Sequence, residues 1–140
     1  MARTLELTLA NHADEVLRLV TAVESFGASA GLSDALLFRV MLALDEVVTN
    51  IMRHAFDDDD VHEITITITV DAGVVTVVVA DGGRPFDPHT VPPADVHAPL
   101  EHRPIGGLGV HLVRSLAQDM AYRRTDGRNV LTLRLTEDIK

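Results

Sequence analysis

All six prolines of this chain lie between residues 85 and 104, and their clustering limits where regular structure can form. Proline fixes its own φ angle and has no backbone N–H, so this segment cannot form the interior of a helix or a strand. Glycines stand on both sides of it, in Asp81-Gly82-Gly83 and in Gly106-Gly107-Leu108-Gly109. A long loop between glycine hinges is typical of a mobile lid over a binding site. The sequence therefore predicts a lid at about residues 84–105, with regular structure before and after it.

The length and composition narrow the class of protein. The 140 residues fit a single domain, residues 1–140, and the absence of cysteine excludes disulfides and thiolate metal sites. No apolar stretch is long enough to span a membrane, and the first residues alternate polar and apolar side chains, unlike a signal peptide. The net charge of −9 opposes binding to nucleic acid. We therefore expect a cytoplasmic protein that binds neither membranes nor nucleic acid.

The hydropathy pattern predicts the order of the secondary structure elements. Alternating or β-branched runs predict strands at residues 3–9, 63–70, 74–80, 120–124 and 130–135. Helical periodicity predicts helices at residues 12–30, 33–56 and 108–117. Asn11 and Ser33 are the expected N-caps of the first two helices, and turns are expected at Asp71-Ala72-Gly73 and at Asp126-Gly127. This order predicts an α/β two-layer sandwich, with a mixed, mainly antiparallel sheet and all the helices on one face.

The helix predicted at residues 33–56 has two distinct faces. Its apolar residues recur at helical spacing and form a core stripe that passes through Val48. Glu46 lies about 160° around the helix from Val48, and Asn50 stacks one turn further along on the same side, with Arg53 close by. A base, a neutral oxygen ligand and a cation on one edge could hold a hydrated divalent metal and a phosphate chain. The alternative for this helix alone is an ordinary solvated face.

Two further segments suggest ligand binding. Asp81 follows the predicted central strand, and its carboxylate could accept a hydrogen bond from the exocyclic amine of adenine, while Gly83 would let the backbone approach a flat base. Gly106-Gly107-Leu108-Gly109 opens the last helix, where free N–H groups and the helix dipole favour phosphate. Taken alone, the segment at Asp81 is also compatible with an ordinary Asp-Gly turn, and the segment at Gly106 with a flexible loop end.

The histidines and the acidic run do not predict a metal site. His89, His97 and His102 lie in the predicted lid at an irregular spacing that fits no zinc pattern, so we expect solvated loop side chains. The run Asp57-Asp58-Asp59-Asp60 interrupts the helical pattern and is expected to be a solvated loop.

The three ligand-binding segments together resemble the GHKL, or Bergerat-fold, ATPase superfamily, which includes gyrase, histidine-kinase catalytic domains and anti-sigma-factor kinases. Glu46-x-x-x-Asn50-x-x-x-His54-Ala55 is similar to the N box of that superfamily, Asp81-Gly82-Gly83 to its first glycine box and Gly106-Gly107-Leu108-Gly109 to its second. The start at Leu5-Glu6-Leu7 and the ending after Asp126-Gly127 resemble one branch, the anti-sigma regulatory serine/threonine kinases of bacterial partner-switching systems. The resemblance covers nearly the whole chain.

This resemblance implies a role for each matching residue. The family's Mg²⁺ ligand corresponds to Asn50, its general base to Glu46 and its adenine-binding acid to Asp81. The implied cofactors are ATP and Mg²⁺. The other implied nucleotide-binding positions lie near the base or the phosphates and are Arg53, His54, Gly83, Arg103, Gly107, Leu108 and Gly109. Among these, Arg103 is the expected γ-phosphate contact, because the predicted lid contains no lysine.

The implied function is an ATP-dependent protein serine/threonine kinase. It would phosphorylate a small anti-anti-sigma partner of the STAS type and sequester a sigma factor or another regulator, and a homodimer is compatible with the resemblance. Two departures concern the adenine pocket and the rate of transfer: Pro85 stands where the first glycine box usually has a glycine, and Arg128-Asn129 replaces a Gly-Thr pair.

Three alternatives are weighed against the kinase. The first is a module that binds nucleotide and sequesters a partner without transferring phosphate. The second is a histidine-kinase catalytic domain; it requires a phosphoacceptor-helix domain, for which we expect no room in the residues before the N-box helix. The third is a match in fold alone with the pocket lost, which the presence of Asn50 and Asp81 disfavours.

Overall fold

The computed structural model describes residues 2–90 and 107–137. In this part of the chain it has five β-strands, three α-helices and one short 3₁₀ helix. The elements in chain order are β1 (Arg3–Ala10), α1 (Glu15–Ser29), α2 (Asp34–His54), β2 (Glu63–Asp71), β3 (Val74–Asp81), η1 (Pro88–Thr90), α3 (Gly107–Leu116), β4 (Asp119–Thr125) and β5 (Arg128–Thr136). Each strand and each α-helix predicted from the sequence is present, with ends that differ by a few residues.

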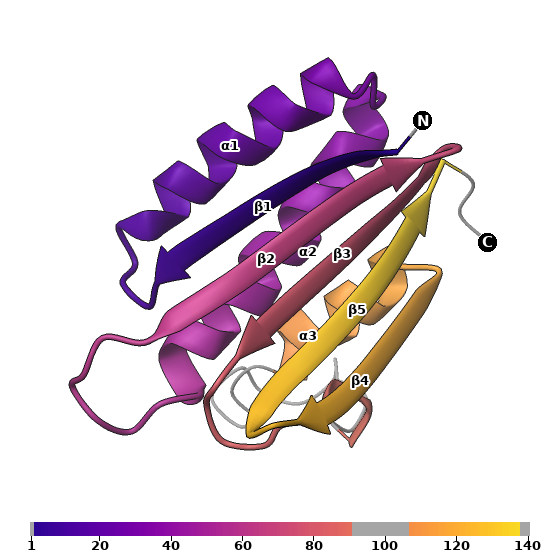
Figure 1. Cartoon of the computed structure of the whole chain (residues 1–140). Helices are drawn as coiled ribbons and strands as arrows, with labels where there is room; N and C mark the ends of the chain where they lie inside the picture. Colours follow the sequence, from indigo (N-terminus) through magenta and orange to yellow (C-terminus); the bar gives the residue numbers. More distant parts are fainter. Residues whose placement is uncertain (1, 91–106, 138–140) are drawn as a thin grey trace.

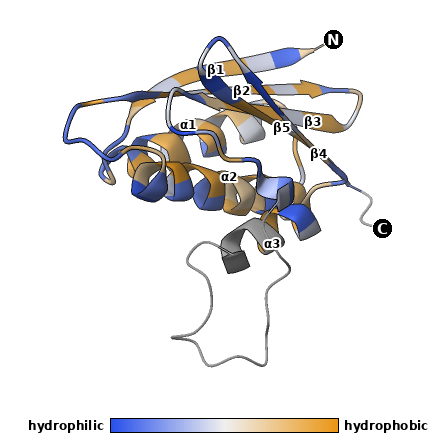
Figure 2. Cartoon of the chain, turned by 90° about the horizontal axis from the view of Figure 1, so that it is seen from below, coloured by the Kyte–Doolittle hydropathy of each residue, from blue (hydrophilic) through white to orange (hydrophobic). Residues whose placement is uncertain are grey.

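The strands form one sheet in the order β1-β2-β3-β5-β4, and the helices lie against one of its faces (Figure 1, Figure 2). The predicted two-layer sandwich is therefore confirmed. Neighbouring strands in this sheet are all antiparallel, so the expectation of a mixed sheet is wrong. β4 does run parallel to β3, as a strand–helix–strand crossover tends to give, but β5 lies between these two strands and pairs antiparallel with both.

The hydrophobic core lies between the sheet and the helices. Alternate strand residues face the helices, and cross-strand neighbours form rows such as Ile66–Val79–Leu131. From α2, Leu44 and Val48 enter this core and are 1% and 0% exposed. Burying each such side chain stabilises the fold by about 1.5–3 kcal/mol. The core face of α2 therefore fixes this helix on the sheet and leaves its opposite edge available for other contacts.

The start of α1 differs from the prediction. α1 begins at Glu15, and Asn11 does not cap it. Asn11 instead pairs with His62 beyond the end of β1: its backbone N–H donates to the His62 carbonyl at 2.9 Å, and its Oδ1 accepts from the His62 N–H at 2.8 Å. The cap of α2 is confirmed, because Ser33 Oγ accepts from the Leu36 N–H at 3.1 Å.

Both predicted strand-to-strand turns are confirmed. The central residues of the first turn, Ala72 and Gly73, have φ angles of +53° and +79°, and those of the second, Asp126 and Gly127, have +53° and +72°. Positive φ at both central residues defines a type I′ turn, whose twist matches that of antiparallel strands. After the second turn, β5 runs beside β3 in a register that pairs residue 129 with residue 81.

Candidate functional site

The long helix α2 directs a polar edge away from its core stripe. On that edge Glu46, Asn50 and His54 are half-buried and Arg53 is exposed. Across residues 2–90 and 107–137, neither Glu46 nor Asn50 has a hydrogen-bond or ion-pair partner. The carboxylate and the amide oxygen therefore keep their acceptor capacity for a ligand. A solvated face would look the same, so the α2 edge gains meaning only from the elements beside it.

Asp81 ends the central strand β3 and is 3% exposed. Its Oδ1 accepts two hydrogen bonds, from the Gly83 N–H at 2.8 Å and from Asn129 Nδ2 at 3.1 Å. Its other oxygen, Oδ2, has no partner in the described part of the chain. Oδ2 is not among the fully enclosed polar atoms that lack a partner, so it keeps contact with solvent and can accept a hydrogen bond from a ligand. This accessible acceptor is the clearest structural indication of a ligand at the end of β3.

Gly83 brings the end of β3 against the end of α2. A Cβ on Gly83 would lie 2.5 Å from Ala55 Cβ and 2.6 Å from the Ala55 carbonyl oxygen. The same carbonyl accepts a hydrogen bond from the Arg84 N–H at 2.9 Å. We expected Gly83 to give room to a flat base, whereas the structure gives a different reason for glycine: the turn packs directly on α2, and a side chain would push the two elements apart.

Asn129, at the start of β5, is a functional candidate that sequence analysis missed. It is 7% exposed, donates to Asp81 Oδ1 and donates to the Arg84 carbonyl at 2.9 Å. Its Oδ1 accepts from the Tyr122 hydroxyl at 2.5 Å. The only sequence signal was that Arg128-Asn129 replaces the family's Gly-Thr pair, and this signal did not indicate what Asn129 contacts.

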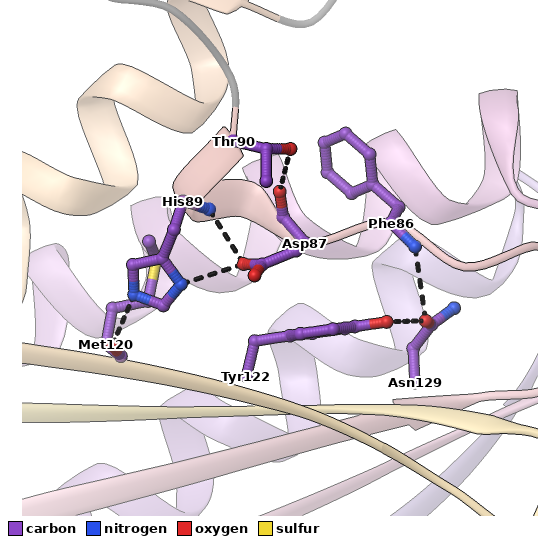
Figure 3. A network of polar contacts seen from close by, with 7 residues as sticks. All are labelled: Phe86, Asp87, His89, Thr90, Met120, Tyr122 and Asn129. Carbon is purple, nitrogen blue, oxygen red and sulfur yellow. Dashed lines mark hydrogen bonds and ion pairs between the residues drawn. The ribbon is translucent and has the colours of Figure 1, made fainter.

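The first part of the predicted lid, residues 84–90, is held against the sheet. His89 lies between Asp87 and β4, with Nδ1 2.8 Å from Asp87 Oδ1 and Nε2 2.7 Å from the Met120 carbonyl oxygen (Figure 3). The Asp87 carboxylate also accepts from the His89 N–H at 2.9 Å. His89 is exposed, as expected of a loop side chain, but its contacts with Asp87 and Met120 were not predicted from the sequence. The rest of the predicted lid, with Arg103, lies outside the described residues.

The titration of this pair follows from its contacts. The hydrogen bond to Asp87 and the one to the Met120 carbonyl raise the pKa of His89, because both favour the protonated ring. Partial burial opposes ionisation of Asp87, but the hydrogen bonds from the His89 N–H and ring outweigh it and lower the pKa of this carboxyl. Both ring nitrogens of His89 face acceptors, so the doubly protonated imidazolium fits this contact best.

Helix α3 starts at Gly107, so Gly107, Leu108 and Gly109 form its first turn. The N–H groups of a first turn have no intrahelical acceptor and can bind an anion. α3 packs on α2, which in turn packs on β3 and β5. The polar edge of α2, the end of β3 and the start of α3 thus belong to elements that contact one another.

Two features of residues 2–90 and 107–137 limit the chemistry of the site. No three His, Cys, Asp or Glu side chains lie close enough together to hold a metal ion. None of the α-helices found there is both long and apolar enough to cross a bilayer.

Fold and site together define an ATPase-type domain: helices on one face of an antiparallel sheet, an acid–glycine turn after the central strand and a helix that starts with glycines. Residues 8–135 match the family described as "Histidine kinase-like ATPase domain", and the chain belongs to this family. Curated relatives are the proteins named "Serine-protein kinase RsbW" from Bacillus cereus and from Bacillus mycoides. Each is 37% identical over 94 residues, which cover 64% of this chain and 58% of the relative. The chain thus spans little more than half the length of these relatives.

A solved structure shares the fold. The crystal structure of the RsbU and RsbW domains of a Mycobacterium tuberculosis protein aligns with a TM-score of 0.66 and 16% sequence identity, covering 96% of this chain and 32% of that one. The family match and the RsbW relatives confirm the resemblance to the GHKL superfamily and to its anti-sigma serine-kinase branch.

Proposed function

We propose that the protein binds Mg·ATP and transfers the γ-phosphate to a serine or threonine of a small anti-anti-sigma partner of the STAS type. The observation that carries this proposal is Asp81: a 3% exposed carboxylate at the end of the central strand, with one oxygen fixed by two hydrogen bonds and the other unpaired. That oxygen can accept from the exocyclic amine of adenine. Gly83 lets this turn pack directly against the end of α2, which holds Asp81 beside the polar edge of that helix.

The polar edge of α2 supplies the groups for phosphoryl transfer. Asn50 offers an amide oxygen to Mg²⁺, a hard cation that prefers oxygen ligands. Glu46, one helical turn away, orients or deprotonates the attacking hydroxyl. Both side chains lack partners within the described residues, which supports this assignment.

The remaining family positions surround the phosphates. The backbone N–H groups of Gly107, Leu108 and Gly109 would bind phosphate oxygens at the start of α3. Arg53 and His54, at the end of α2, would add positive charge nearby, and Arg103 would contact the γ-phosphate from the lid. When bound, Mg²⁺ neutralises charge on the phosphates, and the residues of the chain position the donor and the acceptor.

The proposed partners follow from the relatives named serine-protein kinase RsbW. We place the protein in the cytoplasm, where it would phosphorylate its anti-anti-sigma partner and sequester a sigma factor or another regulator, with a homodimer as the proposed assembly. The second candidate function is a sequestering module that binds nucleotide but transfers no phosphate. The unpaired Glu46 carboxylate favours the kinase, because a pure binder has no use for a base beside the metal ligand.

The test uses purified protein, labelled ATP and the partner that co-purifies with it. Glu46→Gln keeps the shape and hydrogen bonding of the side chain but removes the base, so phosphate transfer should fall about 10²-fold or more while ATP affinity stays within a few-fold. Asp45→Asn, at the exposed neighbouring position, is the matched control and should transfer at the wild-type rate. Binding of Mg·ATP without transfer by the wild type would establish the sequestering module, and no binding of Mg·ATP would refute both functions.

A further inference from the structure

Asn129 faces Asp81 across the two central strands. The register of β3 and β5 places these residues directly opposite each other, and both are almost fully buried, at 7% and 3% exposed. These two buried polar residues are hydrogen-bonded directly to each other, and Asn129 Nδ2 donates to Asp81 Oδ1 at 3.1 Å. Asn129 therefore decides what this carboxylate can offer to a ligand.

The orientation of the Asn129 amide is fixed by its neighbours. On its oxygen side are three donors: the Tyr122 hydroxyl at 2.5 Å, Arg124 Nη1 at 3.1 Å and the Phe86 N–H at 3.3 Å (Figure 3 draws the first and the last). A guanidinium and a backbone N–H cannot accept a hydrogen bond, so the amide nitrogen cannot occupy this side. Arg124 Nη1 is itself held by the Gly83 carbonyl at 2.7 Å.

The nitrogen side of the same amide meets only acceptors. Nδ2 donates one hydrogen to Asp81 Oδ1 and the other to the Arg84 carbonyl, so both donors are used. Asp81 Oδ1 receives a second bond from the Gly83 N–H, and its two lone pairs are thus occupied. Only Oδ2 remains, and Asp81 is presented to a ligand as an acceptor with a single oxygen.

A one-oxygen acceptor distinguishes the two common purines. The Watson–Crick edge of guanine carries two adjacent donors, N1–H and the 2-amino group, which match a carboxylate with both oxygens available. The same edge of adenine carries one donor group, the 6-amino group, next to an acceptor nitrogen. A single available oxygen can satisfy adenine, but it can align with only one of the two parallel guanine donors, which leaves the other without a well-aligned acceptor in a buried site.

We propose that Asn129 is a positioning residue that sets base selectivity: by occupying Asp81 Oδ1, it makes the site accept 6-aminopurine nucleotides and reject guanine nucleotides. This inference rests on the proposed nucleotide site and assigns Asn129 no contact with the ligand. Its effect passes entirely through the carboxylate of Asp81.

The first experiment needs no substitution. ATP, GTP and inosine triphosphate are titrated into the wild-type protein, and inosine triphosphate differs from GTP by the absence of the 2-amino group. We expect ATP to bind most tightly, and GTP and inosine triphosphate to bind equally within about threefold, because the 2-amino group finds no acceptor. GTP binding about tenfold more tightly than inosine triphosphate would show two available carboxylate oxygens and would overturn the proposal.

The second experiment removes the occupying group. Asn129→Ser frees Oδ1 and should lower the ratio of ATP to GTP affinity by about tenfold, the effect of one hydrogen bond. Tyr122→Phe is the matched control, since it removes a donor to Asn129 but leaves the bond to Asp81, and its ratio should stay at the wild-type value. An equal loss of ATP and GTP affinity in a folded Asn129→Ser protein would show a merely structural role and would overturn the inference.

These outcomes separate the inference from the function on which it rests. A wild-type protein that binds ATP but fails the inosine comparison refutes the role of Asn129 and leaves the nucleotide site intact. A wild-type protein that binds none of the three nucleotides refutes the proposed function, and the selectivity role with it. If Asn129→Ser does not fold, as judged by circular dichroism, the wild-type comparison alone decides.

Discussion

Replacing Gly83 by alanine tests how the end of β3 is joined to α2. The new Cβ would lie 2.5 Å from Ala55 Cβ, 2.6 Å from the Ala55 carbonyl oxygen and 2.9 Å from Asp81 Oδ1. The carbonyl oxygen and the Cβ of Ala55 are fixed by the backbone at the end of α2 and cannot rotate away. The turn or the end of α2 must therefore move by about 1 Å to reach ordinary contact distances. Overpacking of this kind costs about 1–3 kcal/mol.

Urea denaturation of two adjacent variants measures that cost. Gly82→Ala is the matched control, because a Cβ at Gly82 meets no atom within 4 Å and its φ is outside the left-handed region. It should leave stability unchanged or raise it by up to about 1 kcal/mol through the unfolded state. We expect Gly83→Ala to be the less stable variant by about 1–4 kcal/mol, with unchanged m-value. Equal midpoints for the two variants would refute the packing argument.

The remaining predictions concern the ligand site and the anchored start of the lid. Mg·ATP at a hundredfold excess over its dissociation constant should stabilise the wild type by about 2.7 kcal/mol in a thermal melt, and Asn50→Ala should lose the Mg²⁺-dependent part of this shift. Asp81→Asn should weaken ATP binding more than GTP binding in a titration; equal losses would mean that Asp81 is structural. Because the pKa of His89 is raised and that of Asp87 is lowered, their contact should stabilise the fold fully between about pH 4 and 6.5 and lose strength as the pH rises through the raised pKa of His89. Urea midpoints at pH 6 and pH 8.5 should therefore fall more for the wild type than for His89→Gln, and parallel changes would contradict this role.

The strands and α2 were predictable because their signals are local. The alternation of Ile64, Ile66 and Ile68 is by itself enough to define a strand with one buried face, and Ser33 caps α2 through a residue three positions away. The start of α1 was not predictable in this way. Asn11 has the chemistry of a helix cap, but its partner His62 comes from a segment that becomes its neighbour only after β1 and β2 pair. Tertiary contacts here override a local preference.

The same physical reason separates the predicted from the unpredicted parts of the site. Glu46, Asn50 and Asp81 stand in recognisable motifs, and their positions relative to the core stripe or the strand end follow from helix and strand geometry. The roles of Asn129 and His89 depend on partners such as Asp81 and Met120, far away in sequence, and on a strand register that no local pattern specifies.

The polar residues of the site divide into those whose bonding capacity is used and those whose capacity remains. Asn129 uses both donors and its oxygen within the protein, so it can hold other groups but has nothing left to offer a ligand. Glu46 and Asn50 use none of theirs within the described chain, and Asp81 uses one oxygen of two. A buried polar network stabilises a structure only when its members are satisfied, and a binding group must keep an unsatisfied acceptor or donor. Asp81 stands at the junction of these two requirements. In the proposed site its fixed oxygen belongs to the fold and its open oxygen to the nucleotide, and Asn129 is the residue that we propose enforces this division.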